Sequence, residues 1–231
     1  MNIKKFFPDL VKTPRYFNIG KIHLFCADFR YMIYSIPPNS IDLVFTDPPY
    51  KKDTLDFYSI MASETARILK PSGFACFYCG GYWKENVIIR LSEHLRYFYD
   101  FIMIHREKSP LLWQRLVISK YTSILCYTLN NIKPTHPVLG AYTGSGSDKV
   151  FHPWQQDEST AGYYIESLSG PNDIILDPFA GSGTFGIVAR AFNRQYIGIE
   201  SDFETFKKAC DRISNQNVID SNSQFTLPFS Q

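Results

Sequence analysis

The stretch from Ile41 to Tyr50 constrains the fold of this chain more than any other. Its first six residues are short and largely apolar, which predicts a buried strand. The strand must end at Asp47, because Pro48 and Pro49 have no backbone N–H group with which to extend a ladder. A carboxylate, two stiff proline units and a phenol ring are therefore presented at the carboxyl end of a strand, where open α/β sheets bind ligands. The alternative is an ordinary surface turn.

Apolar segments of strand length alternate with segments of helix length along most of the 231 residues. The predicted strands are 22–27, 41–46, 74–79, 98–104, 121–129, 173–177 and 195–199. The predicted helices are 29–36, 57–70, 83–95, 157–169, 184–193 and 202–213. The second helix is expected to stop at Pro71-Ser72-Gly73. This alternation predicts a largely parallel sheet covered by helices on both faces, within one sizeable domain.

A second constellation lies between Asp177 and Glu200. A strand is followed by a turn that contains Gly181 and Gly183, then by a helix from Thr184, a second strand and an acid. The glycines let the backbone approach a ligand, and the helix N-terminus offers free N–H groups to an anion. The spacing is not that of a dinucleotide-binding turn, so a mononucleoside with a short acidic tail is favoured. A glycine turn alone would be weak evidence, but the flanking acids strengthen the prediction.

The composition excludes several classes of protein. No run is long and apolar enough to cross a membrane, and residues 1–5 lack a signal-peptide core. The cysteines lie mostly in apolar, strand-like runs, which favours reduced core thiols in a cytoplasmic protein. They are Cys26, Cys76, Cys79, Cys126 and Cys210. Cys76 and Cys79 have CxxC spacing, but no second pair follows at zinc-finger spacing, so no metal site is predicted.

Positive charge is unevenly distributed, although the net charge is only +2. Basic residues are in excess in 1–21 and 84–150, whereas the rest of the chain is neutral to acidic. Residues 130–150 lose all strand and helix pattern but carry Lys133 and Tyr142, which suit contact with nucleic acid. This distribution predicts a protein that touches phosphate with part of its surface. Ordinary solvated basic side chains are the alternative.

The run Asp47-Pro48-Pro49-Tyr50 and the run from Asp177 to Thr184 resemble the catalytic and cofactor motifs of S-adenosylmethionine-dependent DNA amino-methyltransferases. The catalytic motif comes first and the cofactor motif last, an order that resembles the permuted β class of N6-adenine and N4-cytosine enzymes. The resemblance implies a Rossmann-like class I methyltransferase fold, circularly permuted, with a mostly parallel seven-stranded sheet. The strands ending near Glu200 and Asp28 would then be neighbours.

The resemblance also implies roles for single residues. The catalytic residues would be Asp47, Pro48, Pro49 and Tyr50. The residues that bind S-adenosylmethionine would be Asp28, Phe29, Gln155, Asp177, Pro178, Phe179, Gly181, Gly183, Thr184 and Glu200. Asp28 would accept from the adenine amine, Glu200 from the ribose, and Gln155 would contact the methionine moiety. Residues after Gln155 depart from the usual Lys-Pro pair of the family.

The function implied is methyl transfer to N6 of adenine in DNA, as in restriction-modification. Asp rather than Ser at the first motif position favours adenine by analogy. The alternatives are an N4-cytosine enzyme, an RNA or protein N-methyltransferase, and a non-catalytic nucleic-acid-binding module. One domain over residues 1–231 would carry a short target-recognition region at about 105–150. Its shortness favours either lax specificity or a second subunit in a homodimer, and the target base would have to leave the duplex.

Overall fold

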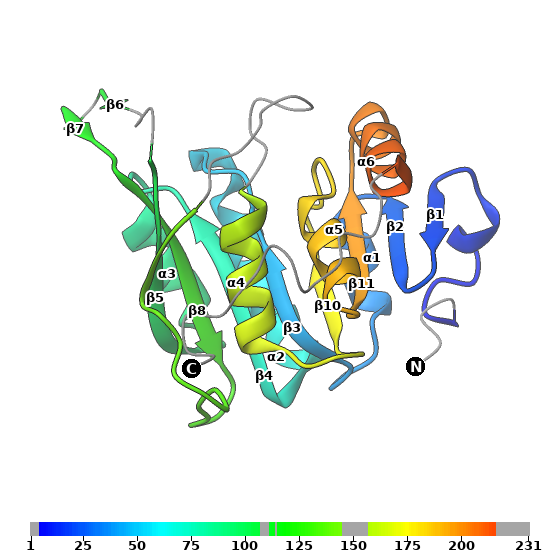
Figure 1. The fold of residues 1–231 in the computed structure, drawn as a ribbon, viewed down its shortest axis with the longest axis horizontal. Helices are drawn as coiled ribbons and strands as arrows, with labels where there is room; N and C mark the ends of the chain where they lie inside the picture. The colour runs from blue at the N-terminus through cyan, green and yellow to red at the C-terminus, as the bar shows by residue number, and fades with distance from the viewer. Residues whose placement is uncertain (1–4, 107–110, 114, 145–156, 216–231) are drawn as a thin grey trace.

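The structure, a computed structural model, describes residues 5–106, 111–113, 115–144 and 157–215 (Figure 1). Within these residues one sheet has nine strands in the order β1-β2-β11-β10-β3-β4-β8-β5-β9. The strands are β1 (Tyr16–Ile19), β2 (Ile22–Cys26), β3 (Ile41–Thr46), β4 (Leu69–Cys79), β5 (Arg96–Ile104), β8 (Tyr121–Thr128), β9 (Ala141–Thr143), β10 (Ile174–Asp177) and β11 (Gln195–Glu200). A separate hairpin consists of β6 (Leu111–Leu112) and β7 (Val117–Ile118).

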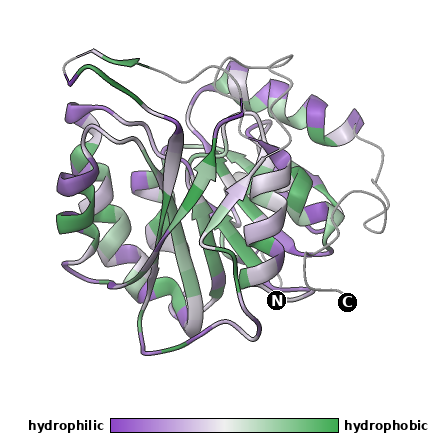
Figure 2. Ribbon diagram, turned by 60° about the vertical axis from the view of Figure 1, so that its left-hand side comes forward, coloured by the Kyte–Doolittle hydropathy of each residue, from purple (hydrophilic) through white to green (hydrophobic). Residues whose placement is uncertain are grey.

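Helices cover both faces of the sheet, as predicted. One face carries α1 (Phe29–Met32), α2 (Leu55–Ile68) and α3 (Lys84–Leu91), and the other carries α4 (Glu158–Leu168), α5 (Thr184–Ala191) and α6 (Phe203–Asn215). The 3-10 segments are η2 (Leu10–Lys12), η3 (Ile33–Ser35) and η4 (Lys52–Thr54). Because successive strand residues point to opposite faces, β3 contributes Phe45 to one apolar core and Val44 to the other. Figure 2 shows the apolar residues concentrated in the central strands.

The sheet is mixed. Strands β2, β11, β10, β3 and β4 run parallel to one another, whereas β8 is antiparallel to both β4 and β5. All seven predicted strands are present, but the expected number of strands is too low for this sheet. β1 was missed because its four residues are all half-buried and show no alternation. β9 was missed because it is a three-residue strand within the stretch expected to be a loop.

The prediction that residues 71–73 stop the second helix is wrong, because these residues lie within strand β4. Helix α2 ends at Ile68, and β4 already begins at Leu69. The pairing of β3 with β4 has an irregularity there, because Ile41 is opposite Leu69 whereas Leu43 is opposite Phe74. A proline is tolerated in a strand at such a bulge, where its missing N–H group interrupts no ladder bond.

Four neighbouring parallel strands bring the predicted site residues to one edge of the sheet. Strands β11 and β10 end at Glu200 and Asp177, β3 ends one residue before Asp47, and β2 ends two residues before Asp28. The predicted proximity of the first two is confirmed, because Glu200 is opposite Cys26 in the parallel pairing of β11 with β2. The Ala27 backbone N–H group also donates to the Glu200 carbonyl at 2.9 Å.

The β6–β7 hairpin projects beyond the body of the protein at the same end as the carboxyl edge (Figure 1). Strand β5 leads into it from this edge, because β5 runs antiparallel to β8, which itself runs antiparallel to β4. The hairpin exposes large apolar side chains, with 74% of Trp113 and 76% of Leu116 accessible to solvent.

Across the described residues, no helix combines the length and apolarity that a membrane span needs.

Candidate active site

The catalytic motif leaves the sheet directly after β3. Pro48 is buried, Asp47 and Pro49 are half-buried, and Tyr50 is 39% exposed. The Tyr50 hydroxyl donates a short hydrogen bond to Asp47 Oδ1. Burial of this hydroxyl and the neighbouring Asp47 charge raise the pKa of Tyr50 well above its ordinary value, so the phenol remains a donor at neutral pH. The motif thus presents a carboxylate and an aromatic ring as one unit.

Gly80, directly after β4, makes room for this unit. A Cβ atom at Gly80 would lie 3.0 Å from Tyr50 Cδ2 and 3.1 Å from Cγ, so a larger residue would push the ring away. Tyr50 stands 30 positions before Gly80 in the chain, so no local sequence pattern signals this contact.

The carboxylate of Asp177 joins the two motifs. Asp177 Oδ1 accepts from Thr46 Oγ1 at 2.7 Å and from the Phe179 N–H group at 3.1 Å, and Oδ2 accepts from the Tyr196 hydroxyl at 2.8 Å. The residue is fully buried. Thr46 immediately precedes Asp47, the predicted catalytic acid, so a single buried acid connects the end of β3 with the glycine turn after β10. This connecting role was not predicted, and direct contact of Asp177 with a cofactor stays a prediction.

Two glycines bring the Tyr196 hydroxyl to this acid. A Cβ atom at Gly198 would lie 2.5 Å from Tyr196 Cε1, and one at Gly186 would lie 3.0 Å from the same atom. The tyrosine ring therefore lies along its own strand, over Gly198 and under α5. Neither glycine belongs to a motif recognised in the sequence.

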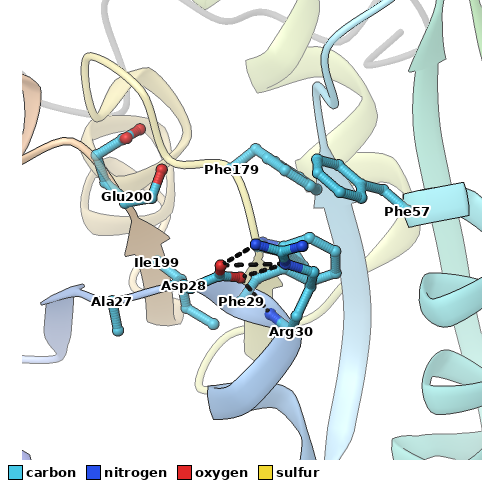
Figure 3. A pocket seen from close by; sticks show the side chains of 10 residues that line it. Ala27, Asp28, Phe29, Arg30, Phe57, Phe179, Ile199 and Glu200 are labelled. Atoms are coloured by element: carbon cyan, nitrogen blue, oxygen red, sulfur yellow. Dashed lines mark hydrogen bonds and ion pairs between the residues drawn. The ribbon is translucent and has the colours of Figure 1, made fainter. Parts of the chain in front are cut away.

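An aromatic pocket lies beside the glycine turn (Figure 3). Phe179 stands with its ring centroid 4.7 Å from that of Phe29 and 6.0 Å from that of Phe57. The pocket lining also includes Pro178, Ile199 and the acids Asp28 and Glu200. Phe57 was not predicted as a site residue, because its position on the apolar face of α2 assigned it to the core. The pocket offers aromatic surface between two carboxylates, which is suitable for a nucleoside.

Asp28 caps the short helix α1 and forms an ion pair within the pocket. It accepts from the Arg30 backbone N–H group at 2.9 Å and from Arg30 Nη2 at 2.6 Å. Hydrogen bonding from the Arg30 guanidinium holds the pKa of Asp28 below its ordinary value, so the acid is ionised. The Arg30 guanidinium carbon also lies 5.4 Å from the Phe57 ring centroid. Arg30 Nε also donates to Asp28 Oδ1 at 3.0 Å and to Oδ2 at 3.1 Å, so Arg30 occupies the about four acceptor positions of the carboxylate. A ligand amine would therefore have to replace part of this ion pair.

Glu200 holds the glycine turn from the side of the pocket. Its Oε2 atom accepts from the Gly181 N–H group at 3.0 Å, and Oε1 accepts from the Asp202 N–H group at 2.8 Å. Burial raises the pKa of Glu200, and these N–H donors oppose the shift. Gly181 and Gly183 have φ values of +50° and +77°, which glycine adopts without strain. Helix α5 then begins at Thr184.

Among the predicted site residues, Asp28, Phe29, Pro178, Phe179 and Glu200 line one pocket. Residues 47–50 lie outside this lining and are connected to the glycine turn through the hydrogen bond of Thr46 with Asp177. Gln155 lies outside the described residues. Among the described residues, no group of three or more His, Cys, Asp or Glu side chains is arranged to hold a metal ion. The residues that sequence analysis missed are Thr46, Phe57, Gly80, Gly186, Tyr196, Gly198 and Arg30.

The structure has the α/β fold of class I methyltransferases, with a mixed sheet. The family model described as DNA methylase, for N6 and N4 methyltransferases, matches residues 135–211. The DNA adenine methyltransferase YhdJ of Escherichia coli K12 is 47% identical over 231 aligned residues, which cover 77% of this chain and 78% of that protein. The chain belongs to the N6/N4 DNA methyltransferase family.

Other relatives are more distant. The type II methyltransferase M.HpaI of Haemophilus parainfluenzae is 27% identical over 84% of this chain and 74% of its own length. The structure of the cytosine-N4-specific PvuII DNA methyltransferase matches with a TM-score of 0.75, at 21% identity, over 87% of this chain and 89% of that chain. The structure of an M1.HpyAVI–SAM complex matches with a TM-score of 0.71, at 24% identity, over 84% and 100%. These two structures support the fold.

The buried acid at the centre of the site gives a prediction about stability. Burial, opposed by the hydrogen bonds from Thr46 and Tyr196, raises the pKa of Asp177 from 3.8 to about 7. The folded protein then holds a proton that the unfolded chain releases, so stability falls as pH rises from about 4 to about 7. Asn cannot titrate. We expect Asp177→Asn to cost more at pH 5 than at pH 8, by roughly 2–3 kcal/mol in urea unfolding.

The matched control is Asp53→Asn, since Asp53 is exposed on the short segment η4. Its effect on the free energy of unfolding should be the same at both pH values. An equal cost of Asp177→Asn at pH 5 and pH 8 would show that Asp177 titrates at an ordinary pKa.

Proposed function

We propose that this protein transfers the methyl group of S-adenosylmethionine to N6 of adenine in DNA. The observation that carries the proposal is the hydrogen bond between Thr46 and Asp177, because it fixes the Asp47 motif beside the glycine turn and its aromatic pocket. The name of the relative YhdJ, a DNA adenine methyltransferase, supports adenine as the target. An N4-cytosine enzyme is the second candidate, supported by the fold of the PvuII enzyme.

The described residues fit this cofactor. Phe29, Phe57 and Phe179 would hold the adenine ring, with Asp28 accepting from its amine and Glu200 accepting from the ribose hydroxyls. Backbone N–H groups of the turn at Gly181–Thr184 would face its acidic end. Pro178 borders the same pocket, and we keep Gln155 as a proposed contact to the methionine moiety. When bound, S-adenosylmethionine supplies an electrophilic methyl group.

The Asp47 motif would activate the target amine. The lone pair of an exocyclic amine is delocalised into the base, which makes it a poor nucleophile. Asp47 and the Pro48 carbonyl would accept hydrogen bonds from the two N–H groups of the amine and direct its lone pair outward. Pro49 would keep the turn rigid. Tyr50 would stack on the base after it leaves the duplex. The Tyr50 hydroxyl donates to Asp47 Oδ1 in this structure, so the incoming amine would replace the hydroxyl as the hydrogen-bond donor. Most of the rate gain would come from positioning.

The order of the strands supports a circularly permuted domain. The sheet order β2-β11-β10-β3 places the first strand of the pocket beside strands from the end of the chain. We propose that residues 1–231 form one methyltransferase domain in which about 105–150 recognise the target. The expectation of a homodimer is a separate prediction, which light scattering on the purified protein would test.

The β6–β7 hairpin is the described part of that region best placed to meet DNA. Leu112 lies near Gly81, and Arg115 donates to the Tyr82 carbonyl at 3.3 Å. The hairpin therefore rests on the segment directly after Gly80, the glycine that packs against Tyr50. Its exposed apolar side chains could fill the space that a flipped base vacates. Arg115 adds positive charge beside them.

The central test of the proposal is Asp47→Ala. Removing one preorganised partner of the reacting group should lower methyl transfer on the order of 10²–10³-fold. Tritium transfer to unmethylated DNA, followed by nucleoside mass spectrometry, gives both rate and product. The control is Asp53→Ala, which removes an exposed acid close in sequence. N4-methylcytosine as the product would establish the second candidate, and label found only in RNA or protein would reject a DNA substrate.

A second test concerns the cofactor. Glu200→Gln keeps the shape of the side chain but loses its charge, and charged hydrogen bonds contribute about 1.5–3 kcal/mol. We expect the Kd for S-adenosylmethionine in calorimetry to rise roughly 10- to 100-fold. Glu204→Gln, on the exposed side of α6, is the control. Unchanged affinity in the Glu200 variant would remove the ribose role.

A third test concerns the hairpin. Trp113→Ala should raise the KM for DNA about tenfold, since base–aromatic contacts contribute about 1–3 kcal/mol. The Kd for the cofactor should stay unchanged, because the hairpin lies outside the pocket. Ile89→Ala truncates another exposed apolar residue, on α3, and serves as the control. A KM for DNA that rises equally in both variants, or in neither, would argue against a hairpin contact.

A further inference from the structure

Helix α6 places one charged side chain beneath the glycine turn. The Arg212 side chain is only 5% exposed. Arg212 Nη1 donates to the Ser182 carbonyl at 3.0 Å, to Ser182 Oγ at 3.0 Å and to Thr184 Oγ1 at 2.9 Å. Its Nη2 atom forms a short ion pair with Glu158 at the start of α4. One guanidinium therefore connects α6, α4 and the turn.

Packing a helix through a buried guanidinium is unfavourable, because the charged group loses its contact with water. Burial lowers the pKa of Arg212, and the charge of Glu158 opposes this shift. The other buried residues of α6 are Phe206, Ala209 and Ile213, which are all apolar. An apolar residue at position 212 would avoid the desolvation cost of a charge. The polar contacts of Arg212 with the turn therefore indicate a role beyond packing.

The turn is in close contact with α6. A Cβ atom at Gly183 would lie 3.0 Å from Ile213 Cδ1 and 3.3 Å from Ala209 Cβ. On the pocket side, Glu200 accepts from the Gly181 N–H group, and on the α6 side, Arg212 donates to the Ser182 carbonyl. Groups of opposite charge thus fix two peptide units of the same turn.

We propose that Arg212 is a positioning residue for the cofactor-binding turn. Its fork of donors holds Ser182 and Thr184 so that the turn has its binding conformation before a ligand arrives, and Glu158 fixes the guanidinium. Preorganisation of this kind lowers the ordering cost of binding. The inference rests on the proposed function for the identity of the ligand but not for the ordering of the turn.

The test compares Arg212→Met with the wild type. Met has a similar length and leaves no buried charge. We expect the Kd for S-adenosylmethionine in calorimetry to rise about 10- to 100-fold. The kcat at saturating cofactor should stay within a few fold, because Arg212 does not face the reacting groups. Amide hydrogen exchange at residues 181–184, measured without ligand, should become faster.

The matched control is Arg190→Met. Arg190 is a half-buried arginine that donates to the Ile213 carbonyl of α6 at 3.0 Å, without a contact to the turn. It should change neither the Kd nor the exchange of the turn. Equal effects of the two variants, or unchanged values in Arg212→Met, would overturn the proposal and leave Arg212 a packing residue.

Two further outcomes are informative. If Arg212→Met does not fold, Glu158→Gln and Arg212→Lys replace it as test variants. Lys cannot form the planar fork of donors, and Glu158→Gln removes the charge that fixes the guanidinium. Each variant should therefore weaken binding, by less than tenfold. Wild-type affinity in both would reject the proposal. Wild-type protein that binds no S-adenosylmethionine would refute the proposed function, whereas the hydrogen exchange of the turn would still decide the role of Arg212.

Discussion

The buried carboxylate of Asp177 is the interaction on which the site depends. Parallel pairing of β10 with β3 brings the ends of the two strands together, but pairing alone leaves the loops that follow them free to diverge. The three hydrogen bonds to Asp177 come from Thr46, Tyr196 and the Phe179 backbone. They fix the start of both loops and the strand that leads to Glu200. The distance between the acid–proline motif and the pocket is therefore set within the core.

Charged groups are buried on both sides of the glycine turn, and hydrogen bonds to specific partners offset the free energy lost when these groups leave water. Glu200 accepts N–H groups on the pocket side, while Arg212 donates to oxygens on the α6 side. Each of these ions would be unfavourable alone. A turn built from glycine has little stiffness of its own, because glycine has the largest backbone freedom. Rigid neighbours thus supply an order that the turn residues lack.

The sequence allowed seven strands of the sheet, most helix boundaries and the two motifs to be predicted, because each depends on local pattern. Asp47 and Glu200 were found from the residues that follow or precede them. Tyr196 and Arg212 were not, because their roles arise from contacts with Asp177 and Ser182, which are distant along the chain or belong to another element. A weak signal existed for Arg212, since a charged residue stands beside Ala209 and Ile213 on the apolar face of a helix.

The pocket draws on both ends of the chain, and this has a consequence for folding. Asp28 and Glu200 are adjacent only because β2 pairs with β11, which follows it by about 170 residues. Contacts of such separation carry a loop-closure cost and form only when the intervening sheet is in place. The pocket therefore cannot persist in a partly folded chain, in contrast to a site built within one βαβ unit. A ligand that binds there acts only on the folded state, so its binding energy stabilises the whole sheet and not a local element.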